Sequence, residues 1–411
     1  MHKTLLQINS VCNSGSTGKI AEGIGKLAVE RGWDSYIAWG RKFNLSSSKT
    51  FKIDTELEIR FHGLKSRLFD GEGTGSVMAT KRLLNRMDEI KPTVVQIHNL
   101  HGYYINYPLL MQYLIEKRIP TFLTLHDCWV FTGHCAHFAS IGCEKWKTGC
   151  KACPSIKDYP ESWFVDNSTR NWKLKNKFIG GCENLSLIPV CDWMNNLLSQ
   201  SFLRDKRIIT LHNGVNVDLF QPTSLSEEKA NKYGIARNKH ILLAVSNFWN
   251  EAKGLNDIVE LRKKLDNSYQ IVIVGHHDGV NMPEGIIGIS HTENQEELRD
   301  LYSDADVFIN PTHADTFPTT NLEAMACGTP VVTYDTGGCS ESVGFTGEYG
   351  EVVRANKPEQ MAEAIKVVIK NGKKHYSTAC REKVEIDFNE NKQFQKYIDL
   401  YEDTLKDFNV K

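Results

Sequence analysis

The sequence predicts an α/β protein that contains two doubly wound parallel sheets. Its 411 residues are too many for one ordinary core and fit two domains of roughly 200 residues each. Short apolar runs alternate with helical stretches along the whole chain, which is typical of parallel sheets. The polar stretch 221–229 separates two series of such runs. We therefore expect two Rossmann-like domains that meet near residue 220.

The predicted strands occur in two groups, and each strand precedes a helical stretch. The first group contains residues 5–8, 35–39, 94–98, 121–125, 185–188 and 208–211. The second group contains residues 241–245, 270–274, 285–290, 307–310 and 330–333. This division gives an N-terminal domain of residues 1–218, a C-terminal domain of residues 219–390 and a last helix within residues 391–411.

The composition is that of a soluble globular protein, with 41% apolar and 24% charged residues. No run approaches the ~18 apolar residues that span a bilayer, and the apolar run at the N-terminus is too short for a signal peptide. We therefore expect a cytoplasmic protein. The net charge of −1 hides an asymmetry, because residues 1–218 hold 28 Lys and Arg against 20 Asp and Glu, and residues 219–411 hold 21 against 30.

The positive half of the chain suggests contact with an anionic surface. Its densest basic and aromatic stretch is residues 163–178, which includes Arg170, Trp172, Lys173, Lys175 and Lys177. One interpretation is peripheral contact with the inner face of a membrane, and the other is a solvated helix face. Nucleic acid is not an expected partner, since no binding motif accompanies the charge.

Two acids separated by seven residues lie where a loop is expected to meet a helix. Asp315 follows the predicted strand 305–310, and Glu323 lies one turn into the next helix. The end of the loop, expected to cap this helix, is Thr319, Thr320 and Asn321. Unpaired N–H groups at a helix N-terminus suit a diphosphate, and a carboxylate one turn later suits a ribose diol. The pattern predicts a nucleotide pocket at the carboxyl end of a strand.

This acid pair resembles the signature of the retaining glycosyltransferases of family 4, which use it to bind a nucleotide-sugar donor. The first acid of that family is usually Glu, and here it is Asp315. Similar patterns occur at residues 15–18, 95–99, 124–127, 188–193, 212–216 and 253–254. The resemblance implies the GT-B fold, in which two facing Rossmann-like domains border an interdomain cleft and the last helix packs back onto the first domain.

The resemblance implies a donor site in the C-terminal domain. Lys253 would hold the diphosphate together with the N–H groups before Glu323, Glu323 would hold the ribose, and Asp315 would face the sugar. The family usually has an Arg about five residues before this Lys, where the present sequence has Phe248 next to Asn247. Lys253 is therefore expected to be the sole cation on the diphosphate, and Asn247 to lie at the donor. The alternative is a surface lysine at a turn.

Histidines follow two neighbouring predicted strands of the N-terminal domain. His126 comes directly after residues 121–125, and in the family a His at this point faces the reacting sugar. The residues after the preceding strand that are expected to line the acceptor side are His98, Asn99 and His101. A buried structural histidine is the alternative for His126.

The glycine turn at residues 15–18 fails as a phosphate-binding P-loop. That motif needs Gly where Asn13 stands and Ser or Thr where Ile20 stands. By the resemblance, Gly18 lets the backbone approach the donor phosphate or the acceptor. A plain turn between strand and helix is the alternative.

Four of the 11 cysteines gather within 19 positions, namely Cys135, Cys143, Cys150 and Cys153. Clustered cysteines that end in C-x2-C indicate a metal more often than disulfides in a cytosolic protein. A tetrahedral zinc ion on four thiolates would be structural, because no coordination position stays open. Free thiols and disulfides are the alternatives.

The sequence therefore predicts a retaining glycosyltransferase without a catalytic metal. It would move a hexose from a UDP- or GDP-sugar to a saccharide acceptor, such as a lipid-linked one, in surface polysaccharide biosynthesis. The catalytic residues would be His126, Asp315 and Lys253. A nucleotide-sugar epimerase or hydrolase on the same scaffold, and a non-catalytic zinc-stabilised subunit of a polysaccharide-assembly complex, are the alternatives.

Overall fold

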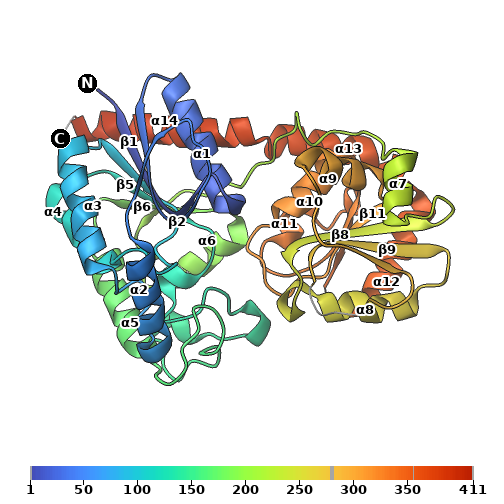
Figure 1. Cartoon of the computed structure of the whole chain (residues 1–411), viewed down its shortest axis with the longest axis horizontal. Helices are drawn as coiled ribbons and strands as arrows, with labels where there is room; N and C mark the ends of the chain where they lie inside the picture. The colour runs from blue at the N-terminus through green and yellow to red at the C-terminus, as the bar shows by residue number, and fades with distance from the viewer. Residues whose placement is uncertain (1, 278–281, 355, 410–411) are drawn as a thin grey trace. The chain divides into compact units, whose positions relative to one another are not determined.

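The computed structural model describes residues 2–277, 282–354 and 356–409, which divide into two compact units (Figure 1). The first unit comprises Met1–His212 and Gln393–Lys411, and the second comprises Asn213–Lys392. The division lies close to the boundary expected near residue 220. The last helix, α14 (Glu390–Asn409), contributes its residues from Gln393 onward to the first unit.

The first unit contains a seven-stranded sheet with all neighbouring strands parallel. In spatial order the strands are β3 (Lys49–Lys52), β2 (Asp34–Phe43), β1 (Thr4–Cys12), β4 (Val94–Ile97), β5 (Thr121–Leu125), β6 (Leu185–Pro189) and β7 (Arg207–Ile208). Its other helices are α1 (Gly15–Glu30), α2 (Glu56–Phe69), α3 (Val77–Ile90), α4 (Tyr107–Lys117), α5 (Ser168–Lys175) and α6 (Asp192–Leu198). The sheet order reverses between β1 and β4, so ligands are expected outside the carboxyl ends of these strands.

Helix α14 completes the core of the first unit, along which Figure 1 shows it running in red. Phe394, Tyr397 and Tyr401 pack with Ile20 and Ile24 of α1 over the sheet. A Cβ atom added at Gly23 would lie 2.1 Å from the Phe394 ring, so the glycine permits this close approach. Burial of these aromatic side chains stabilises the unit by roughly 1.5–3 kcal/mol for each large side chain.

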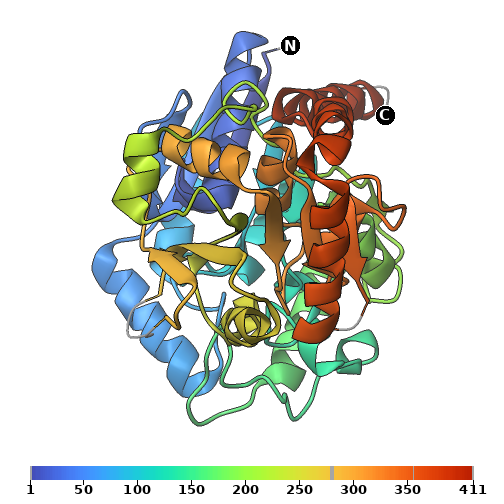
Figure 2. The same cartoon turned by 90° about the vertical axis from the view of Figure 1, so that its right-hand side faces the viewer.

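The second unit contains a six-stranded parallel sheet. In spatial order the strands are β10 (Ile286–Ile289), β9 (Tyr269–His276), β8 (His240–Phe248), β11 (Val307–Asn310), β12 (Val331–Tyr334) and β13 (Gly350–Val353). Its helices are α7 (Glu227–Tyr233), α8 (Leu255–Lys264), α9 (Gln295–Asp304), α10 (Thr319–Ala326), α11 (Cys339–Val343), α12 (Pro358–Asn371) and α13 (Lys373–Asp387). Within this unit, α8 and α12 lie on one face of the sheet and α9, α10 and α13 on the other (Figures 1 and 2).

The two sheets confirm the predicted doubly wound α/β fold. The predicted strand 208–211 is shorter than expected, because pairing at this edge of the sheet is limited to Arg207 and Ile208. Two edge strands, β3 and β13, were not predicted. Within the described ranges, no helix has both the length and the apolar character needed to cross a bilayer.

Candidate functional site

The candidate donor site lies at the carboxyl ends of β8 and β11, where the sheet order of the second unit reverses. The loop after β8 leads through a short 3-10 turn, Glu251–Lys253, into α8. The loop after β11 leads into α10. Both loops carry residues that the sequence assigned to nucleotide-sugar binding.

Lys253 and Asp315 form an ion pair that joins these two loops. The Lys253 Nζ atom lies 2.7 Å from Asp315 Oδ2 and also donates to the Ala314 carbonyl at 3.3 Å. The Asn250 side chain accepts a hydrogen bond from the Lys253 backbone N–H at 3.0 Å and so fixes the turn. The two charged side chains retain 34% and 23% exposure. The predicted cation and the predicted sugar-facing acid are therefore direct partners.

Two glycines allow the backbone around this ion pair to pack closely. At Gly254, with φ of +78°, an added Cβ atom would lie 2.1 Å from the Pro311 carbonyl oxygen. At Gly337, with φ of +57°, it would lie 1.8 Å from the carbonyl oxygen of Asp315. Only glycine tolerates both the left-handed conformation and this proximity. The loops after β8, β11 and β12 are thereby held against one another.

Helix α10 begins at Thr319 with Pro318 as its N-cap residue, and the cap makes no side-chain hydrogen bond. The predicted cap residues Thr319, Thr320 and Asn321 are instead the first turn of the helix, because the fixed φ of the preceding proline lets the helix begin directly after it. Thr319 and Thr320 are half-buried.

The Asn321 side chain is fully buried and has a structural role. Its Oδ1 atom accepts from Asn310 Nδ2 at 2.9 Å, and its Nδ2 atom donates to Ser342 Oγ at 3.2 Å. These bonds tie α10 to β11 and α11. Because the Asn321 side chain is occupied by these bonds, its backbone N–H is the part of this residue that could bind a phosphate.

Glu323 is held in place by Tyr302, a residue that sequence reasoning missed. The Tyr302 hydroxyl donates to Glu323 Oε2 at 2.9 Å from helix α9. Burial, followed by the neighbouring Glu323 carboxylate, holds the pKa of Tyr302 well above its ordinary value, so the hydroxyl keeps its proton. The half-buried Glu323 carboxylate is thus oriented before any ligand binds.

Asn247, which was predicted to lie at the donor, and its neighbour Phe248 are both exposed. Asn247 is exposed near the end of β8. Phe248, which replaces the arginine that the resemblance implies, is 61% exposed and stacks on His276 with ring centroids 5.1 Å apart. Lys253 therefore remains the predicted cation, and the structure places it beside Asp315.

In the first unit, a chain of hydrogen bonds fixes the orientation of His126. Gln7 Nε2 donates to the Ala21 carbonyl at 2.7 Å, so its Oε1 atom accepts from His98 Nε2 at 3.0 Å. His98 Nδ1 then accepts from His126 Nε2 at 3.3 Å. A neutral imidazole has one donor and one acceptor nitrogen, which leaves Nδ1 of His126 as an acceptor.

The low pKa values of His98 and His126 indicate that both imidazoles are neutral at physiological pH. Burial lowers the pKa of His126 to about 4 and that of His98 well below its ordinary value. For His98, the nearby His126 lowers the pKa further. A neutral His126 can accept a hydrogen bond from a sugar hydroxyl but does not carry a charge.

His101 forms a pair with Asp127, the residue that follows His126. His101 Nε2 lies 2.7 Å from Asp127 Oδ2, and its Nδ1 atom lies 3.0 Å from the Tyr159 hydroxyl. Burial alone would lower the pKa of His101, but the Asp127 carboxylate outweighs it and raises the pKa. The three predicted acceptor-side residues thus differ: His98 is buried, Asn99 is half-buried and accepts from Tyr104 through its carbonyl, and His101 is paired.

Gly18 lies in the first turns of α1, against the loop that follows β1. A Cβ atom added here would lie 3.1 Å from both the Asn13 backbone nitrogen and the Val11 Cγ2 atom. Close packing of the helix on this loop is therefore sufficient reason for the glycine.

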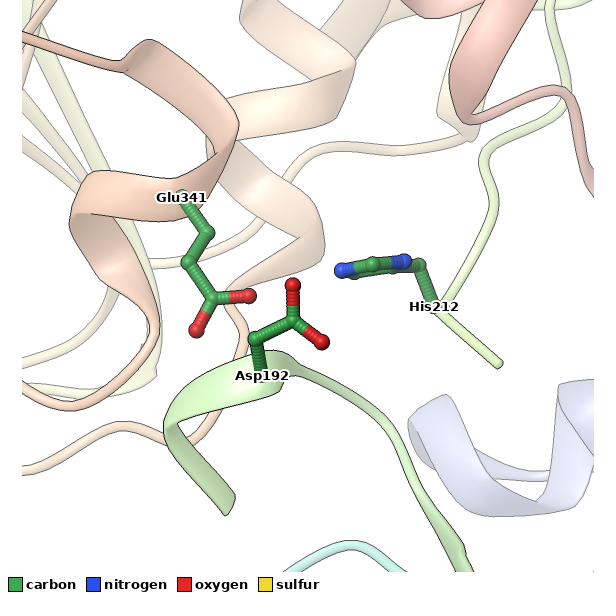
Figure 3. A group of neighbouring side chains, drawn as sticks. All are labelled: Asp192, His212 and Glu341. Atoms are coloured by element: carbon green, nitrogen blue, oxygen red, sulfur yellow. The ribbon is translucent and has the colours of Figure 1, made fainter. Parts of the chain in front are cut away.

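A second carboxylate and imidazole meet in the first unit. Asp192, the first residue of α6, and His212 point toward each other in Figure 3, with ligand atoms within 4.8 Å. Glu341, which the figure also labels, belongs to α11 of the second unit. Sequence reasoning did not single out Asp192 or His212 as site residues, although both lie in segments that carry the family resemblance.

The structure also places the four clustered cysteines and the basic stretch of residues 163–178. All eleven cysteines are free thiols, and among the described residues no three of the four clustered sulfur atoms lie within 4.8 Å of one another. In residues 163–178, Lys175 is buried over the Trp129 ring, 3.3 Å from its centroid, and Trp172 is half-buried. Arg170, Lys173 and Lys177 remain exposed.

Residues 226–383, most of the second unit, match the family model of group 1 glycosyl transferases. The chain is 22% identical over 386 residues to a putative colanic acid biosynthesis glycosyl transferase, WcaC, of Escherichia coli strain K12, covering 88% of this chain and 92% of that protein. It is also 22% identical over 215 residues to N,N'-diacetylbacillosaminyl-diphospho-undecaprenol alpha-1,3-N-acetylgalactosaminyltransferase of Campylobacter jejuni, covering 50% of this chain and 56% of that protein.

Several solved structures resemble the whole chain. The sucrose-phosphate synthase of Thermosynechococcus elongatus superposes with a TM-score of 0.71 at 15% identity, over 98% of this chain and 100% of that one. The Anabaena protein HepE in complex with UDP-glucose superposes with a TM-score of 0.66 at 14% identity, over 99% of this chain and 100% of that one. The structural likeness shows the fold, and together with the family match it supports a glycosyltransferase of the GT-B fold.

Proposed function

We propose that the chain is a retaining glycosyltransferase that moves a hexose from a UDP- or GDP-sugar to a saccharide acceptor, without a catalytic metal. The observation that carries this proposal is the set of groups at the switch point of the second sheet. An ammonium paired with Asp315, the N-terminus of α10 and the oriented Glu323 carboxylate all belong to the segments that follow β8 and β11 there. These are the groups that a diphosphate and a ribose diol require.

In this proposal each donor group has one task. Lys253 and the N–H groups of the first turn of α10 stabilise the negative charge that develops on the departing diphosphate. Glu323, held by Tyr302, accepts hydrogen bonds from the ribose hydroxyls. When the donor binds, Lys253 contacts the diphosphate as well as Asp315. Asp315 then accepts a hydrogen bond from the sugar.

The first unit would supply the acceptor side. His126 would accept a hydrogen bond from a sugar hydroxyl through Nδ1, because its Nε2 atom is committed to His98. No residue of the proposed site is required as a nucleophile when the leaving phosphate takes the acceptor proton on the same face of the sugar. Retention of configuration follows from such a front-face reaction.

The acceptor class that we propose is a lipid-linked saccharide of a surface polysaccharide. The names of the Escherichia coli and Campylobacter jejuni relatives support this class. The exposed Arg170, Lys173 and Lys177 would add electrostatic contact with an anionic membrane surface at about 1 kcal/mol each.

A direct test measures binding and stereochemistry separately. Calorimetric titration of the full chain with UDP, GDP and their sugars identifies the donor, and NMR of the product gives the anomeric configuration. Binding of a nucleotide sugar with retained configuration supports the proposal. No affinity for any nucleotide diphosphate, or an inverted product, contradicts it.

A further inference from the structure

One small cavity of the first unit has four thiols and an imidazole among the residues that line it. Cys135, Cys143, Cys150, Cys153 and His134 surround a space of about 10 Å³ for the centre of a water-sized sphere. That volume suits a single atom or ion. The surrounding segment has only short 3-10 turns, at Ala139–Ile141 and Lys145–Lys147, so no sheet or long helix holds it together.

His134 is the residue that distinguishes this cavity from a cluster of ordinary thiols. Its Nδ1 atom lies 2.6 Å from Asp70 Oδ1, and both side chains are buried. Its Nε2 atom is buried and has no hydrogen-bond partner among the described residues. His134 also lines the thiol cavity. A carboxylate on one ring nitrogen, with the other nitrogen left for a ligand, is the usual arrangement of a metal-bound histidine.

The surrounding backbone also favours a bound thiolate at Cys150. The Gly133 N–H donates to Cys150 Sγ at 3.1 Å. A Cβ atom added at Gly133 would lie 2.6 Å from the Cys150 Cβ atom and 2.3 Å from the Ser168 carbonyl oxygen, so only glycine lets this N–H reach the sulfur. Asp70, in turn, accepts a hydrogen bond from the Asn167 N–H at 2.9 Å, which fixes the carboxylate against His134.

We propose that His134 Nε2 and the sulfur atoms of Cys135, Cys150 and Cys153 bind one structural zinc ion, with Asp70 orienting His134. Five candidate ligands compete for the four positions of tetrahedral zinc. An unpaired buried nitrogen is costly, whereas a half-buried thiol left out of the site behaves as a small apolar group. Cys150 accepts from Gly133, and Cys153 interacts with both Cys135 and His134. Cys143 is therefore the candidate that we expect to stay outside.

The charge of this ligand set is partly offset. Three thiolates, a neutral imidazole and Zn²⁺ carry a net charge of −1, and the Asp70 carboxylate on His134 adds another negative charge. The buried Lys175, when protonated, opposes this charge, because it is close enough to Cys150 and Cys135 to interact with their charge. Binding releases the three thiol protons to solvent, so zinc affinity rises with pH.

The ion would draw its ligands closer together. Tetrahedral Zn–S bonds of about 2.3 Å place neighbouring sulfur atoms roughly 3.8 Å apart, and among the described residues no three of these ligand atoms lie within 4.8 Å of one another. A segment that lacks a hydrogen-bonded ladder can make this adjustment. Zinc binding is therefore expected to order residues 132–167.

The test is the metal content of the full chain, purified without chelator. We expect about one zinc per chain, retained in Cys143→Ser and lost in Cys150→Ser and His134→Gln. Asp70→Asn should weaken zinc binding about 10- to 100-fold, although all four atoms that bind the ion remain. The Cys143→Ser variant is the matched control, since it removes a thiol from the same cavity.

A second measurement covers the case in which a ligand variant fails to fold. Co²⁺ added to the zinc-depleted wild-type chain should give the tetrahedral absorption of three thiolates and one nitrogen. A wild-type chain that holds no zinc and does not bind Co²⁺ overturns the site. A four-thiolate spectrum, or loss of zinc in Cys143→Ser with retention in His134→Gln, overturns the assignment of His134.

Discussion

Replacing Lys253 by methionine tests the proposed donor site most directly. An ammonium and a phosphate oxygen about 3 Å apart attract by ~5 kcal/mol at an effective dielectric constant of about 20 and by ~1.4 kcal/mol in water. The Lys253 side chain is 34% exposed, which places the site between these limits. We therefore expect a loss of about 2–4 kcal/mol of transition-state stabilisation, the range found for single groups of this kind.

That free energy corresponds to a fall in kcat/KM of roughly 30- to 900-fold. The assay is turnover of the nucleotide sugar at saturating acceptor, together with calorimetry of the free nucleotide diphosphate. Lys264→Met is the matched control, because Lys264 is also paired with an acid, Glu359, at 3.0 Å and is similarly exposed. The control should keep its turnover within a factor of two or so, as a surface pair contributes about 0–1 kcal/mol.

The partner variant Asp315→Asn should have the opposite effect on the free nucleotide. Without the carboxylate at 2.7 Å, Lys253 has no competitor for the diphosphate, so affinity for UDP or GDP should be equal or higher. Turnover should still fall, since the sugar contact is lost. A loss of turnover under threefold in Lys253→Met, or weaker binding of the free nucleotide in Asp315→Asn, would show that the diphosphate does not bind at this pair.

Three further outcomes are expected. Glu323→Ala should weaken nucleotide binding more than Tyr302→Phe, which removes only the orienting hydroxyl; equal affinity of all three proteins for UDP and GDP in calorimetry would refute the ribose assignment. His126→Ala should lower turnover while leaving nucleotide affinity unchanged, and because the pKa of His126 is lowered to about 4, wild-type turnover should not fall between about pH 8 and pH 6 through protonation of this imidazole; parallel losses of affinity and rate would assign His126 a structural role. Binding to anionic vesicles should weaken steeply as salt rises, since the Debye length is ~8 Å at physiological salt, and should fall in Arg170→Ser; equal binding to neutral vesicles would show that this face is only solvated.

Much of the fold follows from local sequence patterns, because most strands are buried apolar runs. The strands that were not predicted are at sheet edges, where one side of the strand meets solvent. Strand β3, Lys49–Lys52, has exposed lysines at both ends, and β13, Gly350–Val353, begins with a glycine. Neither has the apolar run by which the central strands were recognised.

The candidate site is only partly predictable for a different reason. Asp315, Glu323 and Lys253 lie in short segments with recognisable spacing, so sequence reasoning found them. Tyr302 acts on Glu323 from 21 residues away and has the composition of a core residue. Gln7 orients His98 from 91 residues away, within an apolar strand. Contacts at such separations depend on sheet order, which local pattern does not contain.

The candidate groups of the two units differ in charge and in burial. In the second unit, Lys253 and Asp315 form an ion pair at a partly exposed position, which suits a diphosphate that gains charge as it departs. In the first unit, burial and the bond from Gln7 through His98 keep His126 neutral and fix which nitrogen accepts. A charged imidazole there would carry protons on both nitrogens and could not accept from a sugar hydroxyl. Replacing Gln7 by leucine should therefore lower turnover through His126 alone, and the nucleotide affinity of the second unit should not change.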